Sequence, residues 1–498
     1  MNKLQLQTKI FLGSVSGVLM ARSFSSSDTW ILVPVGIAVW WAGSHKRQLS
    51  DYLFFSYSLS IAFWFARLSW LNLVGLDAYI LLALLMSLIT GISGYFMYKV
   101  KDLPLPFFWY GLIFISVESL TDYIPFGGFP WGRIAYDSAD APWANLMSYG
   151  SSPLVTAAIL LIAALMIPSL GFVLQKAFAA SIVFVITIAA FSLFLIDLGK
   201  IDKPSLSKID LAIIQGSVPR TGLLFNEQKL EVLKYHVKET DNLLENTSQN
   251  YDAILWPENS IDVDPFKNKE AGALVKDVLK KYNKPLLSGA VLQKNNGLVN
   301  SVLLWDPKNL NVVDSYNKSH LVPFGEYLPY RDLLSRYIKR FTLIPQDFIA
   351  GGSPNNVFIK DVPISPIICF EVAWNKNLYQ QIKNGGELIS VHTNNATYAF
   401  SNQIEQQFMI TRIRAMETGR DIVVTATTGV SAHINRYGKI VWMSKEFVPQ
   451  SKIVSPSLYS DLTPAVKYSV FIERISLFGI VIPFILLFIR YIRRRNED

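Results

Sequence analysis

The chain has 498 residues, of which 51% are hydrophobic and 17% are charged. Soluble globular proteins carry about 25% charged residues, so this composition excludes a chain that is wholly dissolved in water. The single cysteine, Cys369, excludes an intramolecular disulfide and a cysteine-rich zinc site. The five histidines are scattered, and no phosphate-binding loop or dinucleotide fingerprint occurs, so we expect neither a metal nor a cofactor.

Apolar runs dominate the first 198 residues and predict a polytopic helical membrane bundle. A helix needs roughly 17–25 apolar residues to cross a bilayer. Several runs reach this length, while the first two and the fifth are shorter. With one more run near the C-terminus, about eight transmembrane helices are expected. The runs cover residues 8–22, 28–42, 52–74, 77–99, 105–119, 146–167, 172–197 and 471–489.

Lysines and arginines gather on one side of these eight spans and predict their orientation. The positive-inside rule assigns that side to the cytoplasm. Both termini are then expected in the cytoplasm, and the long segment 199–470 outside it. These flanking charges explain the net charge of +8, so no nucleic-acid partner is needed to account for it. They are Lys3, Lys9, Lys46, Arg47, Lys99, Lys101, Lys176, Arg490, Arg493, Arg494 and Arg495.

Two features of the apolar region have alternative interpretations. The first 22 residues could be a cleaved signal peptide, but no clear small-residue cleavage site follows, so we interpret them as an uncleaved helix. Arg67 lies within the apolar stretch 63–70. An ionisable group at membrane depth is a functional candidate, and a snorkelling side chain or a pair with an acid at a helix end explains it equally well.

Residues 199–470 alternate short β-branched runs with polar helical patterns, which predicts an α/β domain with two cover layers. We therefore expect three parts: membrane helices over 1–198, this domain over 199–470, and a last span with a basic tail over 471–498. Helices are expected over 226–247 and 404–418, the second ending at Gly419. Strands are expected over 211–215, 253–256, 285–292, 301–305, 312–316, 366–370, 388–392, 422–426 and 432–435.

Three of the expected strands deliver reactive side chains. Glu258 follows the strand at 253–256, Lys318 follows 312–316, and Cys369 lies at the end of 366–370. In an α/β domain the strand ends converge on one edge, where sites form. A glutamate can take the proton of a thiol, and a lysine can stabilise both thiolate and oxyanion. Taken singly, each residue has a structural interpretation, since a lone cysteine is usually a small buried hydrophobe.

The surrounding motifs resemble those of the carbon–nitrogen hydrolase (nitrilase) superfamily, which has a Glu–Lys–Cys triad in this order. More specifically, they resemble its membrane-embedded branch, the apolipoprotein N-acyltransferases. The resemblance implies an α-β-β-α sandwich for the domain and covers nearly the whole chain. The motifs are WPENS (256–260), YNKSHLVPFGE (316–326), ICFE (368–371), RAMETGR (414–420), TGVS (428–431) and GFPW (128–131).

The resemblance implies a role for each matching residue. Glu258 would be the general base, Lys318 the oxyanion-stabilising group and Cys369 the nucleophile. Glu326 and Glu371 would be supporting carboxylates. A helix opening after Cys369 would lower the pKa of its thiol through the helix dipole.

The chain departs from the family pattern at three places. Phe370 replaces the usual tyrosine after the nucleophile, and the segments 215–225 and 394–398 lack the usual tryptophan. These departures concern substrate recognition more than the reaction class.

The implied reaction is a ping-pong acyl transfer. A phospholipid donates an acyl group to the cysteine, and the thioester then acylates the N-terminal diacylglyceryl-cysteine of an apolipoprotein. The implied location is the bacterial inner membrane, with the catalytic domain in the periplasm, and we expect a monomer. Two alternatives stay open: a membrane-tethered amidase or nitrilase that uses water as acceptor, and a transporter or receptor whose soluble domain is inactive.

An interfacial helix is expected over 330–343. Apolar side chains fall on one helical face and basic ones elsewhere, which is typical of a helix lying at a membrane surface. A surface helix packed on its own domain is an equally good interpretation. As a lid or arm over the site, this segment would contact lipid through Leu333, Leu334, Tyr337, Ile338 and Phe341.

Overall fold

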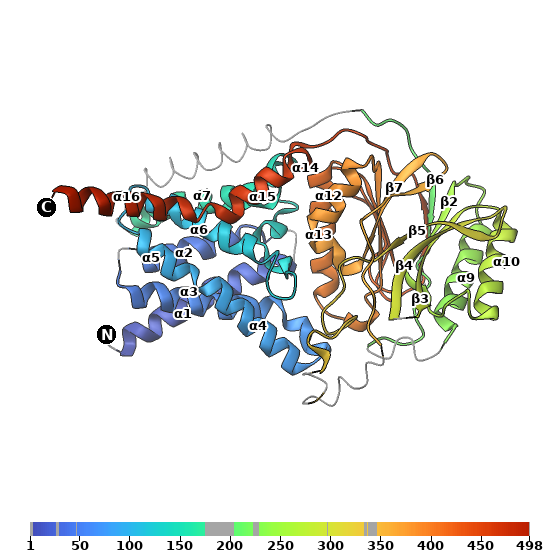
Figure 1. Cartoon of the computed structure of the whole chain (residues 1–498), viewed down its shortest axis with the longest axis horizontal. Coiled ribbons are helices and arrows are strands. Elements are labelled where there is room, and N and C mark those ends of the chain that lie inside the picture. Colours follow the sequence, from blue (N-terminus) through green and yellow to red (C-terminus); the bar gives the residue numbers. More distant parts are fainter. Residues whose placement is uncertain are drawn as a thin grey trace. The chain divides into compact units, whose positions relative to one another are not determined.

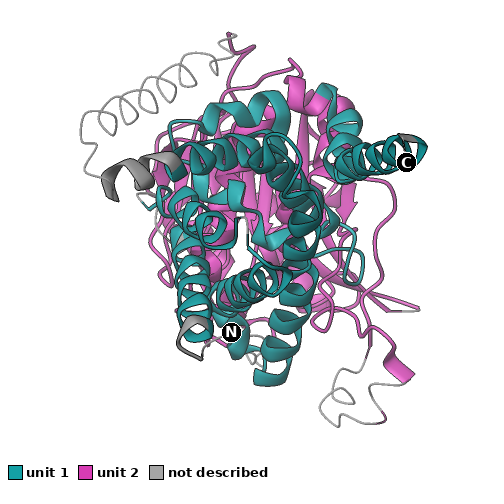
Figure 2. Ribbon diagram, turned by 90° about the vertical axis from the view of Figure 1, so that its left-hand side faces the viewer, with its two compact units in different colours: residues 1–201, 467–498 teal, residues 202–466 magenta. Residues whose placement is uncertain are grey.

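The computed structural model describes residues 3–25, 29–45, 47–174, 204–222, 229–295, 297–332, 336 and 346–497. The chain divides into two compact units, which Figure 2 shows in different colours. Unit 1 comprises residues 1–201 and 467–498, and unit 2 comprises residues 202–466. The functional assignment of three parts, over 1–198, 199–470 and 471–498, stays a prediction.

Unit 1 is a bundle of apolar helices (Figure 1). Helix α1 packs against α2 and α3, α3 packs against α4, and α7 packs against α2 and α6. Near the C-terminus, α15 packs against α6 and α7. The helices are α1 (Lys3–Arg22), α2 (Leu32–Ser44), α3 (Leu49–Arg67), α4 (Leu76–Gly91), α5 (Ser93–Val100), α6 (Pro106–Leu120), α7 (Met147–Leu174), α15 (Ser469–Phe478) and α16 (Val481–Glu497).

The contact between α1 and α3 depends on two glycines one helical turn apart. A Cβ atom on Gly17 would lie 2.2 Å from the backbone oxygen of Leu59, and one on Gly13 would lie 2.1 Å from Ser58 Oγ. Small residues at this spacing let the backbones of two membrane helices approach closely. The sequence of α1 therefore selects α3 as its neighbour by shape.

The described residues include two segments that are long and apolar enough to cross a membrane, Leu76–Val100 and Ala144–Ile167. A bent pair, Ser469–Phe478 with Val481–Asn496, gives a third if it forms one span. Helices α2 and α6 are apolar but shorter. The structure thus has a helical, membrane-type unit, and the number of eight spans stays a prediction. The expected run 172–197 lies almost wholly outside the described residues.

Arg67 forms a buried ion pair. Its two terminal nitrogens donate to the two oxygens of Asp137, at 3.0 and 3.2 Å, and neither side chain is more than 1% exposed. The guanidinium also lies 4.1 Å from the ring centre of Phe24. Of the interpretations left open by the sequence, these contacts favour pairing with an acid.

The GFPW motif is part of the interior of unit 1. Trp131 is fully buried and packs against Trp70, with 5.8 Å between the ring centres. Gly128 has a φ of +112°, and a Cβ there would lie 2.0 Å from the oxygen of Asp122, so this turn needs glycine. The motif therefore holds a connection between helices of unit 1.

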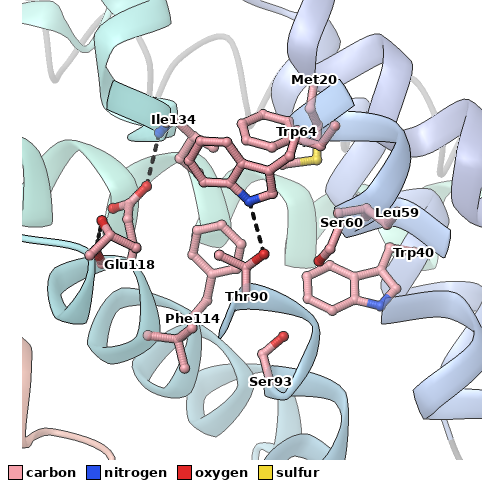
Figure 3. A pocket seen from close by; sticks show the side chains of 14 residues that line it. Met20, Trp40, Leu59, Ser60, Trp64, Thr90, Ser93, Phe114, Glu118 and Ile134 are labelled. Atoms are coloured by element: carbon pink, nitrogen blue, oxygen red, sulfur yellow. Dashed lines mark hydrogen bonds between the residues drawn. The ribbon is translucent and has the colours of Figure 1, made fainter. Parts of the chain in front are cut away.

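A small cavity lies inside unit 1 (Figure 3). Trp64, which donates to Thr90 at 3.0 Å, and Glu118, which accepts from the Ile134 backbone at 2.8 Å, are among the lining residues. The cavity volume that the centre of a water molecule can occupy is about 40 Å³, which is enough for a few waters.

Unit 2 contains two six-stranded sheets. The first has the order β12-β1-β2-β3-β4-β5, and the second has the order β11-β10-β9-β8-β7-β6. The central strands β1, β2 and β3, and likewise β7, β8 and β9, run parallel. The strands are β1 (Leu211–Ile213), β2 (Ala253–Ile261), β3 (Leu286–Lys294), β4 (Gly297–Asp306), β5 (Asn311–Asn317), β6 (Val357–Ile359), β7 (Val362–Ile368), β8 (Leu388–Thr393), β9 (Ile422–Ala426), β10 (Ala432–Ile434), β11 (Ile440–Met443) and β12 (Lys452–Val454).

The two sheets form the middle layers of an α-β-β-α sandwich. Strand β2 contacts β8 and β9 of the other sheet. Helices α9 (Glu231–Leu244) and α10 (Lys269–Tyr282) cover the first sheet, and α12 (Asn375–Lys383) and α13 (Gln403–Thr418) cover the second (Figure 1). The predicted nitrilase-like α/β architecture is therefore present in unit 2.

Most of the expected strands are present, with shifted ends. The strand expected over 366–370 begins earlier and ends at Ile368, one residue before the thiol. The strand expected to stop at Pro257 continues to Ile261. Three short edge strands, β6, β11 and β12, were not expected. Helix α13 ends as predicted at Gly419, whose φ is +64°.

Candidate active site

The three candidate residues come from both sheets of unit 2. Glu258 lies within β2, Lys318 follows the last residue of β5, and Cys369 follows the last residue of β7. All three side chains are buried, with 5%, 1% and 7% of their surface exposed. Because β2 and β8 face each other across the sandwich, the edge that carries Cys369 adjoins the edge that carries Glu258.

A bulge in β2 aims the side chain of Glu258. The pairing of β2 with β3 shifts register between Trp256 and Ile261, and Asn259 has a φ of +56°. A bulge redirects side chains that regular pleating would place on alternate faces. A Cβ on Gly289 of β3 would lie 2.4 Å from the oxygen of Pro257, so β3 follows the bulge closely only because this residue is glycine.

Cys369 opens a five-residue 3₁₀ helix, Cys369–Ala373, and has a φ of +52°. A residue with a side chain is strained in this region, and neighbouring bonds must hold it there. Arg414 of α13 donates to the backbone oxygens of Val372 at 2.8 Å and Ala373 at 2.7 Å. The RAMETGR motif thus supports the backbone turn that presents the thiol.

Lys318 is shared between two carboxylates. Its Nζ lies 2.8 Å from Glu326 Oε1 and 3.4 Å from Glu258 Oε1. Asn300 Nδ2 donates to the same two oxygens, at 3.1 and 2.7 Å. The other oxygen of Glu258 accepts from the backbone N–H of Asn394 at 2.8 Å. The Glu258 carboxylate and the Lys318 ammonium are therefore held in one hydrogen-bonded cluster.

Burial sets the protonation of this cluster. Burial raises the pKa of Glu258, and Glu326 adds to the increase, whereas Lys318 opposes it. A carboxylate with a raised pKa is a better proton acceptor. Burial acts against the Lys318 ammonium, but the carboxylates of Glu326 and Glu258 outweigh it and raise its pKa well above the usual range. Lys318 is therefore a permanent positive charge.

The thiol of Cys369 belongs to the same electrostatic cluster. Burial raises the pKa of Cys369 to about 12, the Glu258 carboxylate adds to the increase, and Lys318 opposes it. The lowered pKa expected from a helix dipole is thus wrong, because the helix is a single short turn and burial outweighs it. At neutral pH the resting side chain is a thiol, which needs a base to become a nucleophile.

Comparison with known proteins identifies the family. Residues 16–165 match the family model "Apolipoprotein N-acyltransferase N-terminal domain", and residues 211–457 match "Carbon-nitrogen hydrolase". An apolipoprotein N-acyltransferase from Haemophilus influenzae is 24% identical over 97% of this chain and 95% of its own length. One from Photobacterium profundum is 24% identical over 88% and 87%. The chain belongs to the apolipoprotein N-acyltransferase family.

Other matches cover about half of the chain. An apolipoprotein N-acyltransferase from Mycolicibacterium smegmatis is 33% identical over 54% of this chain, and the match spans less than half (46%) of that relative. A solved cysteine-to-alanine mutant of an amidase from the nitrilase superfamily, from Nesterenkonia, has a TM-score of 0.39 at 14% identity, covering 53% of this chain and 95% of the amidase. The predicted family and enzyme class, an acyltransferase of membrane type with a nitrilase-like domain, are confirmed by the family matches.

Glu371 is not one of the three candidate residues Glu258, Lys318 and Cys369, and its hydrogen bonds join two segments of the site. It accepts hydrogen bonds from the backbone N–H groups of Ser319, His320 and Ile368 at 2.8 to 3.0 Å, and from the Tyr316 hydroxyl at 2.9 Å. These donors lie on the segment that carries Lys318 and at the end of β7, next to Cys369. Glu371 therefore connects the segment that carries Lys318 to the turn that begins at Cys369.

Several site residues were not among the candidates. Asn300 bridges the two carboxylates, and Asn394 donates its backbone N–H to Glu258. Thr393 and Gln407 adjoin the thiol. Asn394 begins the segment 394–398, which departs from the family pattern in lacking the usual tryptophan. Asn300 has no local sequence signal, because it lies in the middle of strand β4.

The expected lipid arm is not tested by the structure. Leu333, Leu334, Tyr337, Ile338 and Phe341 lie outside the described residues. Phe370, which replaces the family's tyrosine, packs edge-on against Trp374, with 4.8 Å between ring centres.

Proposed function

We propose that this chain N-acylates the N-terminal diacylglyceryl-cysteine of apolipoproteins, taking the acyl group from a phospholipid through a thioester on Cys369. The observation that carries the proposal is the buried cluster in which the Lys318 ammonium donates a hydrogen bond to the Glu258 carboxylate, in the electrostatic surroundings of Cys369, the one cysteine of the sequence. The family match supports the choice of substrates, since the relatives carry the name of this reaction.

In the first half-reaction, Glu258 accepts the proton of the Cys369 thiol while the sulfur attacks the ester carbonyl of the phospholipid. The raised pKa of Glu258 favours this transfer. The Lys318 ammonium stabilises the developing oxyanion, which accounts for its place beside the base. When the tetrahedral intermediate collapses, the C–O bond breaks and Glu258 returns its proton to the departing lysophospholipid oxygen.

In the second half-reaction, the α-amine of the apolipoprotein attacks the thioester carbonyl. Glu258 takes a proton from the amine, the C–S bond breaks, and the proton returns to the Cys369 sulfur. Glu326 holds Lys318 in place through both steps, because its 2.8 Å contact is the shorter of the two carboxylate contacts.

The membrane unit serves this chemistry because both substrates are anchored in the bilayer. Extracting an acyl chain into water costs ~0.8 kcal/mol per CH₂ group, so a soluble enzyme would bear that cost at each turnover. We propose about eight spans in the bacterial inner membrane, cytoplasmic termini and a periplasmic catalytic unit, acting as a monomer. The basic flanks of the apolar runs support this orientation.

Mass spectrometry of the purified protein after incubation with phospholipid tests the first half-reaction. We expect Cys369 to gain the mass of one acyl chain and to lose it when a diacylglyceryl peptide is added, with formation of an amide. The Cys369→Ser variant should gain no thioester. Release of free fatty acid instead of the amide would favour a hydrolase, and an unmodified thiol with full biological activity would favour a transporter or receptor.

A further inference from the structure

The sulfur of Cys369 has polar neighbours outside the proposed triad. Thr393 is the last residue of β8 and is 3% exposed, and it follows His392, which pairs with Ile368, the residue before Cys369. Its hydroxyl lowers the pKa of the thiol. Gln407 of α13 places its Oε1 atom 3.9 Å from Cys369 Sγ, at the distance of a weak thiol hydrogen bond. The mechanism above uses neither side chain.

A network of amides fixes the orientation of Gln407. Its Oε1 accepts from Asn395 Nδ2 at 3.1 Å and from Gln403 Nε2 at 2.9 Å. Exchanging the oxygen and nitrogen of this amide alone would set donor against donor at both contacts. The Nε2 atom therefore faces Thr393, and it donates to Oγ1 at 2.8 Å.

This arrangement determines where the proton of Thr393 points. Because Oγ1 accepts from Gln407, its own proton is left for a second partner. In the structure this proton points to Asn395 Oδ1 at 3.3 Å. The sulfur of Cys369, at the end of the neighbouring strand β7, is the other acceptor at this place. A thiolate is the stronger acceptor, since hydrogen bonds to ionised groups are about twice as strong as neutral ones. The contact to Asn395 is the resting alternative.

The network is held by packing. Asn395, Gln403, Gln407 and Thr393 are all buried. A Cβ on Gly429 would lie 2.4 Å from Asn395 Oδ1, so the loop after β9 closes tightly over the amide. The hydroxyl therefore has few other positions to adopt.

We propose that Thr393 and Gln407 form a hydrogen-bond switch around the nucleophile, which deepens the function proposed above and depends on it. In the resting state the thiol donates its proton to Gln407 Oε1. When Glu258 accepts that proton, Thr393 turns its hydroxyl proton to the thiolate. Only the proton of the sulfur is transferred, and that of Thr393 stays on its own oxygen. Gln407 is a positioning residue, because its amide directs the hydroxyl of Thr393.

The test measures the rate of Cys369 alkylation by iodoacetamide against pH in the full-length protein in detergent. Thr393→Val keeps the shape and removes the hydroxyl. We expect its alkylation to be about 10- to 100-fold slower at each pH below the thiol pKa, the range of a hydrogen bond to a charged group, and its pH profile to move to higher pH. Thr393→Ser should restore most of the rate.

A matched control lies on the neighbouring strand. Thr425 of β9 is also fully buried, and its hydroxyl bonds the backbone oxygen of Ile214 rather than the sulfur. Thr425→Val should leave the alkylation profile at the wild-type position. An unchanged profile in Thr393→Val, or equal slowing in Thr393→Ser and Thr393→Val, would overturn the proposal.

Gln407 provides a second test that needs no change at Thr393. In Gln407→Glu the new carboxylate accepts the proton of Thr393 and turns it from the sulfur, so alkylation should slow at least as much as in Thr393→Val. Gln407→Met removes the donor without adding charge and should slow it less. A rate in Gln407→Glu equal to that of the wild type would contradict the switch. The absence of an acyl thioester on the wild-type enzyme would instead refute the proposed function, because alkylation does not require acyl transfer.

Discussion

In unit 1 the Arg67 guanidinium meets one carboxylate, Asp137, through two hydrogen bonds, whereas in unit 2 the Lys318 ammonium is shared between Glu258 and Glu326. The first pair is closed: one positive charge, one negative charge, and matched geometry. The second region holds one positive charge, two carboxylates and a thiol that can ionise. A closed pair stabilises the packing of unit 1. In unit 2 there are two carboxylates for one ammonium, so one carboxylate remains available to accept a proton.

The largest effect is expected from removing the base in unit 2. Glu258→Gln keeps the shape and cannot accept the thiol proton, so the rate of acyl-thioester formation should fall about 10²- to 10⁴-fold. Single-turnover acylation followed by mass spectrometry measures it. Glu231→Gln, at a partly exposed position at the start of α9, is the control and should keep the wild-type rate. A rate within a factor of two of wild type in Glu258→Gln would exclude it as the base.

The closed pair in unit 1 should affect stability and leave the chemistry intact. Arg67→Met leaves the Asp137 carboxylate buried and unpaired, a change that costs about 3–5 kcal/mol. Replacing both members, Arg67→Met with Asp137→Leu, should recover most of that loss. Unfolding of the detergent-solubilised variants measures the free energy. If the double variant were as unstable as the single one, the pair would have a role beyond mutual neutralisation.

Glu371 tests whether a buried carboxylate beside the nucleophile is structural. Glu371→Gln keeps one acceptor oxygen but loses charge-assisted bonds to Ser319, His320 and Ile368. We expect a loss of about 1.5–3 kcal/mol in the unfolding free energy, measured by denaturant titration. The position of the acid limb of the rate profile should not move. A shifted limb would place Glu371 among the groups that exchange protons in the reaction.

The smallest effect concerns pH. Burial raises the pKa of Glu258 above its ordinary value of about 4.3, so the acylation rate should rise with pH through that raised pKa. Between the pKa of Glu258 in the unfolded chain and its raised pKa in the folded protein, the folded protein keeps a proton on Glu258 that the unfolded chain has released. Stability should therefore fall as pH rises through this window, and Glu258→Gln should remove that dependence. An acid limb centred at the ordinary glutamate value would contradict the raised pKa.

Much of the catalytic unit could be anticipated because its signals are local. Strands such as β8 and β9 are short runs rich in apolar and β-branched residues, and Gly419 ends α13 in the left-handed conformation that favours glycine. The edge strand β11 was missed although its four residues are all apolar, since so short a run is an ambiguous strand signal; three of the four are exposed in the structure. The order of Glu258, Lys318 and Cys369 in recognisable motifs was sufficient to suggest that they meet.

The arrangement around them was beyond local patterns, because its bonds join residues far apart in the chain. Asn394 reaches Glu258 across 136 positions, and Arg414 reaches the turn after Cys369 across 42. The pKa of the thiol shows the same limit: the helix start suggested a lowered value, and burial produced the opposite. Chain order and residue type thus predicted which groups meet in the proposed site. Folding set their protonation and their partners, since desolvation and long-range hydrogen bonds exist only once both sheets have packed.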